Sequence, residues 1–212
     1  RILYGTRMSF GIGLAGVFVA LGIGLLVGGV AGYRGGRWDT VLMRAAEFVM
    51  MFPSLYVLLA LRSALPPKLA STQVAVLVVI LLGALGWGSL ARVIRGMVLS
   101  IRERDFVTVA KLLGRGDMEI LARHVLPHTA SFIAVAASVS IPGYILAESA
   151  LSVLGLGIQE PAVSLGSLLS EALSIPNLYF HPWVLWPGVM LFLVSLSFHA
   201  VGDALHRGKE YA

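Results

Sequence analysis

The sequence has 212 residues, of which 58% are hydrophobic and only 13% are charged. Soluble domains carry about a quarter charged residues, so this composition excludes an ordinary soluble domain and indicates an integral membrane protein. The absence of cysteine excludes disulfide and thiolate chemistry, and the net charge of +5 is what basic residues gathered on one side of a membrane produce, without nucleic-acid binding.

The first predicted span covers residues 9–32, a clean apolar run that exceeds the about 20 residues needed to cross a bilayer. Small residues recur along it at every fourth position: Gly16, Ala20, Gly24, Gly28 and Gly32. This spacing lets a second helix approach closely, so we expect a helix-packing face. Lining of a transport pathway is the alternative interpretation.

The second and third predicted spans cover residues 45–65 and 73–91, and Pro53 interrupts the earlier one. Helices are favoured over a membrane barrel because the apolar runs are continuous, whereas barrel strands alternate between apolar and polar residues. The fold class expected is therefore all-α. The basic residues that follow the first span predict a cytoplasmic loop there: Arg34, Arg37 and Arg44.

The segment 101–127 is too polar to cross a membrane, and we expect a helix over 101–113 followed by a second over 118–125. Gly114 and Gly116 permit a sharp turn between these helices, because glycine adopts positive φ without steric cost. This order predicts a helix–turn–helix on the cytoplasmic face.

Asp117 is expected to cap the second of these helices, and Pro127 to mark the start of the next span. Apolar residues give the first helix a hydrophobic side: Phe106, Val107, Val109, Ala110, Leu112 and Leu113. Three interpretations compete, namely a solvated loop, an amphipathic helix on anionic lipid, and a docking surface for a cytoplasmic partner. The preset turn favours docking, because a plain loop does not need one.

The fourth predicted span covers residues 129–154 and contains Pro142, Gly143 and Glu148. An acidic residue at membrane depth is costly and often functional, so Glu148 is a candidate for meeting a peptide amine or a cation. A hydrated or paired carboxylate near the outer end is the alternative. Pro142 and Gly143 are expected to kink the span and line a pathway, or else to serve packing alone.

The external loop predicted over residues 155–182 is acidic and contains no lysine or arginine. It is expected to pack over the mouth of a pore, with docking of an outside partner at its edge. The fifth predicted span follows at residues 183–205 and contains Pro187 and Gly188.

Lysine and arginine fix the expected orientation, because they are enriched on the cytoplasmic side. Seven of the sixteen lie within residues 92–128, none lies within 155–182, and the tail carries Arg207 and Lys209. Five spans with a cytoplasmic C-terminus leave the N-terminus outside. We therefore expect a further span to precede this sequence.

Residues 108–127 resemble the "EAA" signature of bacterial ABC importer permeases, E-A-A-x3-G-x9-I-x-L-P. Four residues match: Ala110, Gly114, Leu126 and Pro127. Three depart from it: Thr108 stands for Glu, Val109 for Ala and His124 for Ile. The missing Glu puts in doubt any polar contact that the family makes at that position.

Three longer runs narrow the resemblance to the dipeptide/oligopeptide/nickel permease family, in the type that forms the second of two permease subunits. They are GYRGGRWDTVLMRAAEFVMMFPSL (32–55), ILAESALSVLGLGIQEPAVSLGSLLSEA (145–172) and PWVLWPGVMLFLVSLSFHAVGDALHR (182–207). The resemblance implies a type I ABC importer transmembrane domain over residues 1–212, as a multi-pass protein of a bacterial or archaeal inner membrane.

The resemblance also implies a permease that is not an enzyme and carries no cofactor or metal. Its expected partners are a homologous permease in a heterodimer, two cytoplasmic ATPase subunits that bind ATP and Mg²⁺, and an extracytoplasmic binding protein that delivers peptides. Nickel or another small solute is the alternative cargo. The residues expected to dock the ATPase are Thr108, Val109, Ala110, Lys111, Leu112, Leu113, Gly114, Leu126 and Pro127. Those expected along the pathway are Pro142, Gly143 and Glu148.

Two other classes of protein fit the sequence less well. A secondary transporter would not need the cytoplasmic helix–glycine–helix and would show internal repeats. An intramembrane enzyme would need paired acids or histidines, whereas Glu47, Glu148 and His199 lie on different spans. The sequence also lacks the G-x4-G-K-[ST] loop that binds nucleotide phosphates and the H-E-x-x-H zinc motif.

Overall fold

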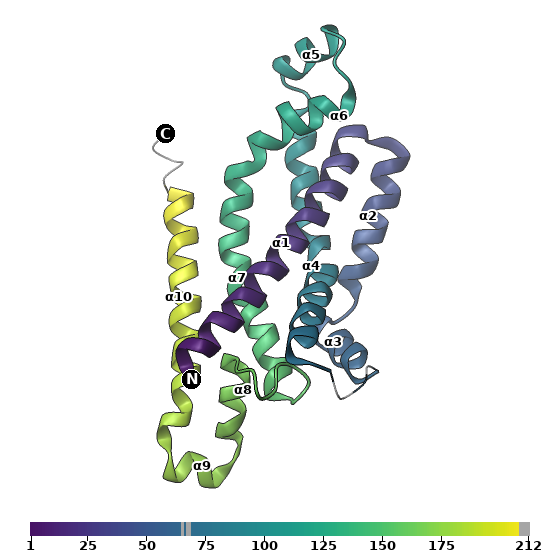
Figure 1. Cartoon of the computed structure of the whole chain (residues 1–212). Helices are drawn as coiled ribbons and strands as arrows, with labels where there is room; N and C mark the ends of the chain where they lie inside the picture. The colour runs from purple at the N-terminus through teal and green to yellow at the C-terminus, as the bar shows by residue number, and fades with distance from the viewer. Residues whose placement is uncertain (65, 67–68, 208–212) are drawn as a thin grey trace.

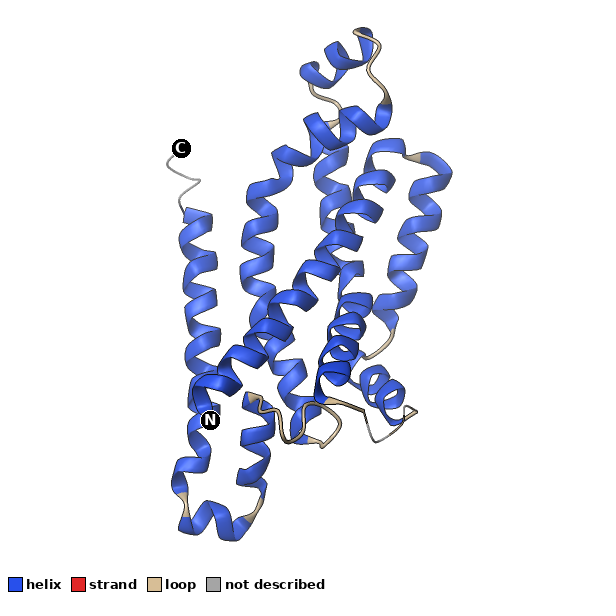
Figure 2. Ribbon diagram, in the orientation of Figure 1, coloured by secondary structure: helices blue, strands red, loops and turns tan. Residues whose placement is uncertain are grey.

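The computed structural model describes residues 1–64, 66 and 69–207, and these residues form helices and loops without a strand (Figure 2). Lys209, which the charge analysis places in the tail, lies outside the described residues. The long helices are α1 (Ile2–Arg34), α2 (Gly36–Met51), α4 (Ser71–Ile101), α7 (Ala130–Val153) and α10 (Trp186–Arg207). The short ones are α3 (Ser54–Ser63), α5 (Asp105–Leu112), α6 (Asp117–Ile120), η1 (Leu121–Val125), η2 (Leu126–Thr129), α8 (Leu165–Ser170), η3 (Glu171–Leu173), α9 (Ile175–Phe180) and η4 (Pro182–Leu185).

The membrane-spanning elements among these residues agree with the five predicted spans. Four helical stretches are long and apolar enough to cross a bilayer, and the bent pair α2–α3 makes a fifth. The helices run alternately up and down, so that the start of α1 and the end of α10 at Arg207 lie at opposite ends of the bundle (Figure 1). α5 and α6 lie together at one end, and α8 and α9 lie at the other (Figure 1).

The small-residue stripe of α1 is a packing face, as expected, and α4 is the helix that it receives. A Cβ atom on Gly28 would lie 2.3 Å from the carbonyl oxygen of Ala91, and one on Gly32 would lie 2.8 Å from that of Arg95. Only glycine allows this approach of two helix backbones, so α1 and α4 form a tightly packed pair.

The first loop is shorter than expected, because α2 begins immediately after Gly35. Gly35 and Gly36 have φ of 66° and 56°, a left-handed conformation that reverses the chain within one turn. The expected cytoplasmic loop before residue 45 is therefore largely helix. The break at Pro53 is confirmed, since α2 and α3 meet there at an angle of 76°.

The third span is longer than expected, because α4 continues past residue 91 to Ile101. Arg95 forms an ion pair with Asp39 of α2, and Arg92 lies 3.9 Å from Glu47 of the same helix. These arginines therefore face acidic partners and do not mark a loop. The helix expected over 101–113 correspondingly starts later, as α5 at Asp105.

The loop expected over 155–182 is mostly helical, and its first helix, α8, packs back against α7 and α1. α7 ends in a Schellman motif: Gly155 has φ of 75°, its N–H donates to the carbonyl of Ser152, and Leu156 N–H donates to that of Leu151. This turn sends the chain back toward the bundle. The segment that follows α7 is thus packed against α7 and α1 through α8.

Candidate functional site

α5 has one buried face and one exposed face. Val107 and Ala110 belong to an apolar cluster with residues from α1, α4, α6 and η1: Tyr33, Ile94, Val98, Ile101, Ile120, Leu121 and Val125. On the other side Leu112 is 82% exposed, Leu113 is 73% exposed, and Val109 and Thr108 are exposed as well. A leucine pair left in water on a helix that is packed from below is typical of a surface that binds another protein.

Gly114 ends α5 in a second Schellman motif. Its φ is +76°, its N–H donates to the carbonyl of Lys111 at 2.9 Å, and Arg115 N–H donates to that of Ala110 at 3.3 Å. The expected sharp turn is therefore present at Gly114. Gly116 does not share this role, because its φ of −69° is open to any residue.

Asp117 does not cap α6, contrary to expectation. Gly116 occupies the N-cap position in an extended conformation, and Asp117 is the first helical residue. The Asp117 carboxylate instead accepts a hydrogen bond of 3.3 Å from the hydroxyl of Tyr33, the penultimate residue of α1. The Asp117 side chain thus contacts a residue far away in the sequence and does not cap its own helix.

The C-terminal end of α1 contacts α5, α6 and Arg102, the residue that follows α4. The Lys111 ammonium lies 5.4 Å from the centre of the Tyr33 ring, within the range of a cation–π contact. Arg102 donates to the carbonyls of Gly32 and Tyr33 at 2.9 and 3.4 Å, which places a positive charge at the negative end of the helix dipole. We call this region, residues 29–39 and 92–128, the α5 end.

The ion pair between Asp39 and Arg95 connects α2 to α4 within the α5 end. Arg95 Nε and Nη2 donate to the two carboxylate oxygens of Asp39, a two-pronged geometry that fixes orientation as well as distance. The Asp39 side chain is 18% exposed and that of Arg95 is 33% exposed, so water screens the pair only partly.

Leu126 and Pro127 lie where α6 passes into α7 through irregular turns. The N–H of Leu126 donates to the carbonyl of Leu121, the i to i−5 bond of a π-helix, and Pro127 has no N–H to continue the α-helical pattern. Leu126 is partly buried, and its side chain would meet a Cβ on Gly29 at 3.4 Å. Leu126 thus anchors the segment on α1, while Pro127 is exposed.

The polar surface of the α5 end is organised around Glu119. Its carboxylate lies 3.1 Å from both Arg115 and Arg123, each four residues away along the chain. Phe106 stacks on His128 at 4.8 Å between ring centres, which joins α5 to η2. These contacts order the exposed face of the segment without covering Leu112 or Leu113.

Glu148 lies in an enclosed hydroxyl cluster near the other end of the bundle. Its side chain is 0% exposed, and the hydroxyls of Ser9 and Ser152 each donate to its carboxylate at 2.7 Å. Ser9 also accepts the N–H of Leu165, and Ser152 accepts that of Ile158, both at 3.0 Å. The carboxylate therefore ties α1, α7 and α8 together in this conformation, and its pathway role stays a prediction.

The two other expected pathway residues have different environments. Pro142 is buried inside α7, whereas Gly143 lines a groove of about 310 Å³. Residues of α3, α4 and α7 form the rest of its wall: Ser54, Leu58, Leu82, Leu85, Gly86, Val139, Ser140, Tyr144 and Ala147. Gly143 thus faces open space, and its pathway role also stays a prediction.

Sequence reasoning missed the residues that brace the α5 end, namely Tyr33, Asp39 and Arg95. Tyr33 and Asp39 both lie in the run 32–55 that carries the family resemblance. Their partners are 56 to 84 residues away, so no local pattern reveals the pairing. The one local signal for Tyr33 is its place as an aromatic residue next to the end of a helix that carries a stripe of glycines.

Comparison with known proteins matches residues 21–211 to the family described as "Binding-protein-dependent transport system inner membrane component". The chain is 36% identical over 206 residues to the oligopeptide transport system permease protein OppC of Haemophilus influenzae, covering 97% of this chain and 64% of that protein. It is 35% identical over 207 residues to the dipeptide transport system permease protein DppC of Bacillus subtilis, covering 97% and 62%. The chain thus spans less than two thirds of the length of these relatives.

Among solved structures, the chain is similar to one of the inward-facing conformations of the MetNI methionine ABC transporter. The TM-score is 0.63 at 17% sequence identity, and the match covers 96% of this chain and 97% of that one. At this identity the similarity speaks for the fold alone, and it agrees with the expected type I ABC importer transmembrane domain.

Proposed function

This chain belongs to the family of binding-protein-dependent transport system inner membrane components, and from that premise we propose that it is a permease subunit of an ATP-driven peptide importer. The names of the relatives support the cargo, since two of them are oligopeptide and dipeptide permeases. The apolar spans support a multi-pass location in the inner membrane. The proposed cell is bacterial or archaeal.

The exposed face of α5 is the observation that carries the proposal. Val109, Leu112 and Leu113 form an apolar surface, and Val107 and Ala110 fix the helix beneath it. We propose that this surface enters a groove of a cytoplasmic ATPase subunit. Ala110 and Gly114 act indirectly, by seating the helix and setting its turn.

The mechanism follows from how firmly α5 is attached to the spans. Two ATPase subunits would bind ATP and Mg²⁺ and close on each other, and the docked helix would move with them. Because Tyr33, Arg95 and Arg102 connect α1, α2, α4 and the α5 segment, these helices would move as one body. The opening of the pathway would then change sides.

The pathway is proposed to form between this chain and a homologous permease, each providing half. An extracytoplasmic binding protein would deliver the peptide, and the helical segment 165–185 would lie at its docking side. Gly143 and the groove beside it are the proposed lining, and Pro142 and Glu148 are the other proposed pathway residues of the same helix, α7.

Reconstitution with the partner permease, the ATPase subunits and the binding protein tests this function. Leu112→Glu is expected to abolish transport and the association of the ATPase, because a buried unpaired charge would replace an apolar contact. Leu173→Glu is the matched control, a 68% exposed leucine at the opposite end of the bundle, and should retain ATPase association. ATPase association that is equal in both variants would contradict docking at α5.

A further inference from the structure

An apolar groove of about 840 Å³ lies between the first half of α1, the first half of α4 and the loop before α8. Its walls are almost entirely apolar, and small residues among them keep it open: Gly11, Ala15, Ala75 and Ala162. A Cβ on Gly11 would meet no atom within 4 Å, so the groove is unfilled at its middle.

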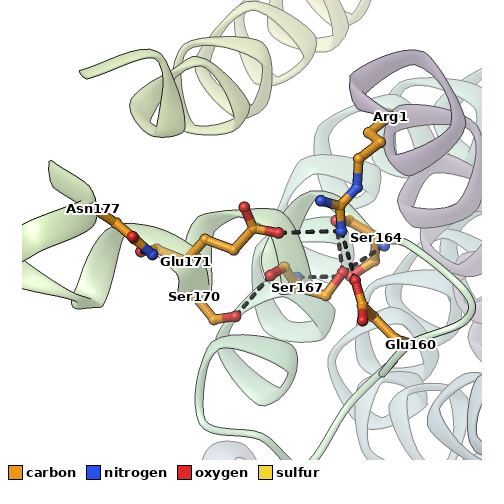
Figure 3. A network of polar contacts seen from close by, with 7 residues as sticks. All are labelled: Arg1, Glu160, Ser164, Ser167, Ser170, Glu171 and Asn177. Atoms are coloured by element: carbon orange, nitrogen blue, oxygen red, sulfur yellow. Dashed lines mark hydrogen bonds and ion pairs between the residues drawn. The ribbon is translucent and has the colours of Figure 1, made fainter. Parts of the chain in front are cut away.

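Two arginines lie at the groove, and they differ in their partners. Figure 3 shows the Arg1 guanidinium between the carboxylates of Glu160 and Glu171, at 2.7 and 3.2 Å. Arg7 also lines the groove and is exposed, but it has no carboxylate within ion-pair distance among the described residues. Within the part of the chain that the structure describes, Arg7 is therefore a cation without an acidic partner beside an apolar surface.

Arg7 lies near the start of a helix long enough to span the membrane, two residues before the predicted span 9–32. It is the sixth residue of α1, about 7.5 Å along the helix from Ile2 at 1.5 Å per residue. Charged residues at such depth pair with another group or extend toward the headgroup layer. Tyr4, one turn before it on the same wall, is a residue type enriched at that layer.

We propose that this groove binds a bilayer phospholipid with an anionic headgroup, its acyl chain against Gly11 and Ala15 and its phosphate at Arg7. The occupant must be apolar along the groove and negative at the Arg7 end, and an anionic lipid of the adjacent leaflet has both properties. A peptide fits less well, because its backbone N–H and C=O groups would face walls with few hydrogen-bonding partners. The inference does not depend on the proposed transport function.

Lipid immobilisation measured by electron paramagnetic resonance tests the proposal. The full complex would be reconstituted in phosphatidylcholine bilayers with trace spin-labelled phosphatidylglycerol or spin-labelled phosphatidylcholine. The motionally restricted fraction should favour phosphatidylglycerol by about fivefold, the effect of one cation near a membrane surface. Arg7→Gln should equalise the two lipids, and Arg7→Lys should keep the preference.

Filling the groove provides the second arm. Gly11→Leu should remove part of the restricted component for both lipids, since its side chain enters open space without a clash. Gly22→Leu is the matched control, because Gly22 is equally open and lies on the same side of α1, eleven residues further along. Arg37→Gln, which removes an exposed arginine at the α5 end, should change nothing.

Several results would overturn the proposal. Equal restriction of the two lipids in the wild-type protein would contradict the preference for an anionic headgroup. A preference that survives Arg7→Gln would contradict the role of Arg7. Identical spectra for Gly11→Leu and Gly22→Leu would show that another chain, or no lipid, fills the groove. An Arg7→Gln variant with normal lipid spectra and a raised KM for peptide would assign the arginine to substrate instead.

Discussion

The two ends of the bundle are held together by different chemistry. At the α5 end, ion pairs and cation contacts join the helices, as between Asp39 and Arg95 or between Lys111 and Tyr33. At the other end, which we call the α8 end (the start of α1, residues 148–173 and their contacts), Arg1 also pairs with Glu160 and Glu171 at the surface, but the buried contacts are hydroxyl groups around the Glu148 carboxylate. Leucines are exposed at both ends, as Leu112 and Leu173 are, whereas the cluster around Glu148 is enclosed.

The difference fits the docking role proposed for the α5 end. Charged groups near water keep their hydration in part, so they can connect helices while a neighbouring surface stays exposed for a partner. Serine hydroxyls are short and can satisfy a buried carboxylate in a space too small for arginine. The contacts at the α5 end therefore fit the docking proposed there, while the Glu148 cluster joins α1, α7 and α8 of the same chain.

The largest predicted effect concerns the closed end. Glu148→Ala should lower the free energy of unfolding by about 3 kcal/mol, because two buried hydroxyls lose their acceptor and a cavity remains. Equilibrium unfolding in mixed detergent micelles measures this loss. Glu148→Gln, which keeps the shape and one acceptor oxygen, should lose less than half as much, and an equal loss would attribute the stability to charge.

The ion pair of the α5 end should contribute less. Asp39→Asn is expected to cost about 2 kcal/mol, since Arg95 loses a charged partner but remains partly exposed to water. The same unfolding assay applies. Exchanging the two residues, as Asp39→Arg with Arg95→Asp, should recover part of the loss, and a double variant worse than either single one would deny a direct pairing.

The turn between the helices of the α5 end gives a smaller effect with a matched control. Gly114→Ala should cost about 1 to 2 kcal/mol, because alanine at φ of +76° is strained even where space is open. Gly116→Ala, two residues later with φ of −69° and equally open space, should be neutral. Transport per ATP hydrolysed should fall in the first variant alone.

The smallest predicted effect on stability separates bracing from folding at the α5 end. Tyr33→Phe removes the hydrogen bond to Asp117 and keeps the ring beneath Lys111, at a cost of about 1 kcal/mol or less. The peptide transported per ATP should nevertheless drop. A normal coupling ratio in this variant would mean that α1 does not transmit the motion of α5.

Local sequence signals predicted the parts of the fold that depend on neighbouring residues. The spans, the break at Pro53 and the turn at Gly114 follow from apolar runs, a missing N–H and positive φ. The glycine stripe predicted a packing face, although only the structure identified α4 as the helix that fills it.

Two of the errors share one cause, which is a charged residue with a distant partner. The third span is predicted to end before Arg92 and Arg95, because their acidic partners on α2 are invisible in the local sequence. Asp117 was expected to cap its own helix, whereas Tyr33 engages it from α1. The surroundings of Glu148 were equally unpredictable, since Ser9 lies 139 residues away.

α1 is one continuous, proline-free helix that contains both Ser9 and Tyr33. These residues are about 36 Å apart along the helix at 1.5 Å per residue. If the Tyr33 end of α1 served as a fulcrum, a tilt of roughly 5° would displace Ser9 by about 3 Å over that lever arm. A displacement of this size would break the hydrogen bonds of Ser9 with Glu148 and Leu165, so a small rotation of α1 at one end would open the contacts around Glu148 at the other.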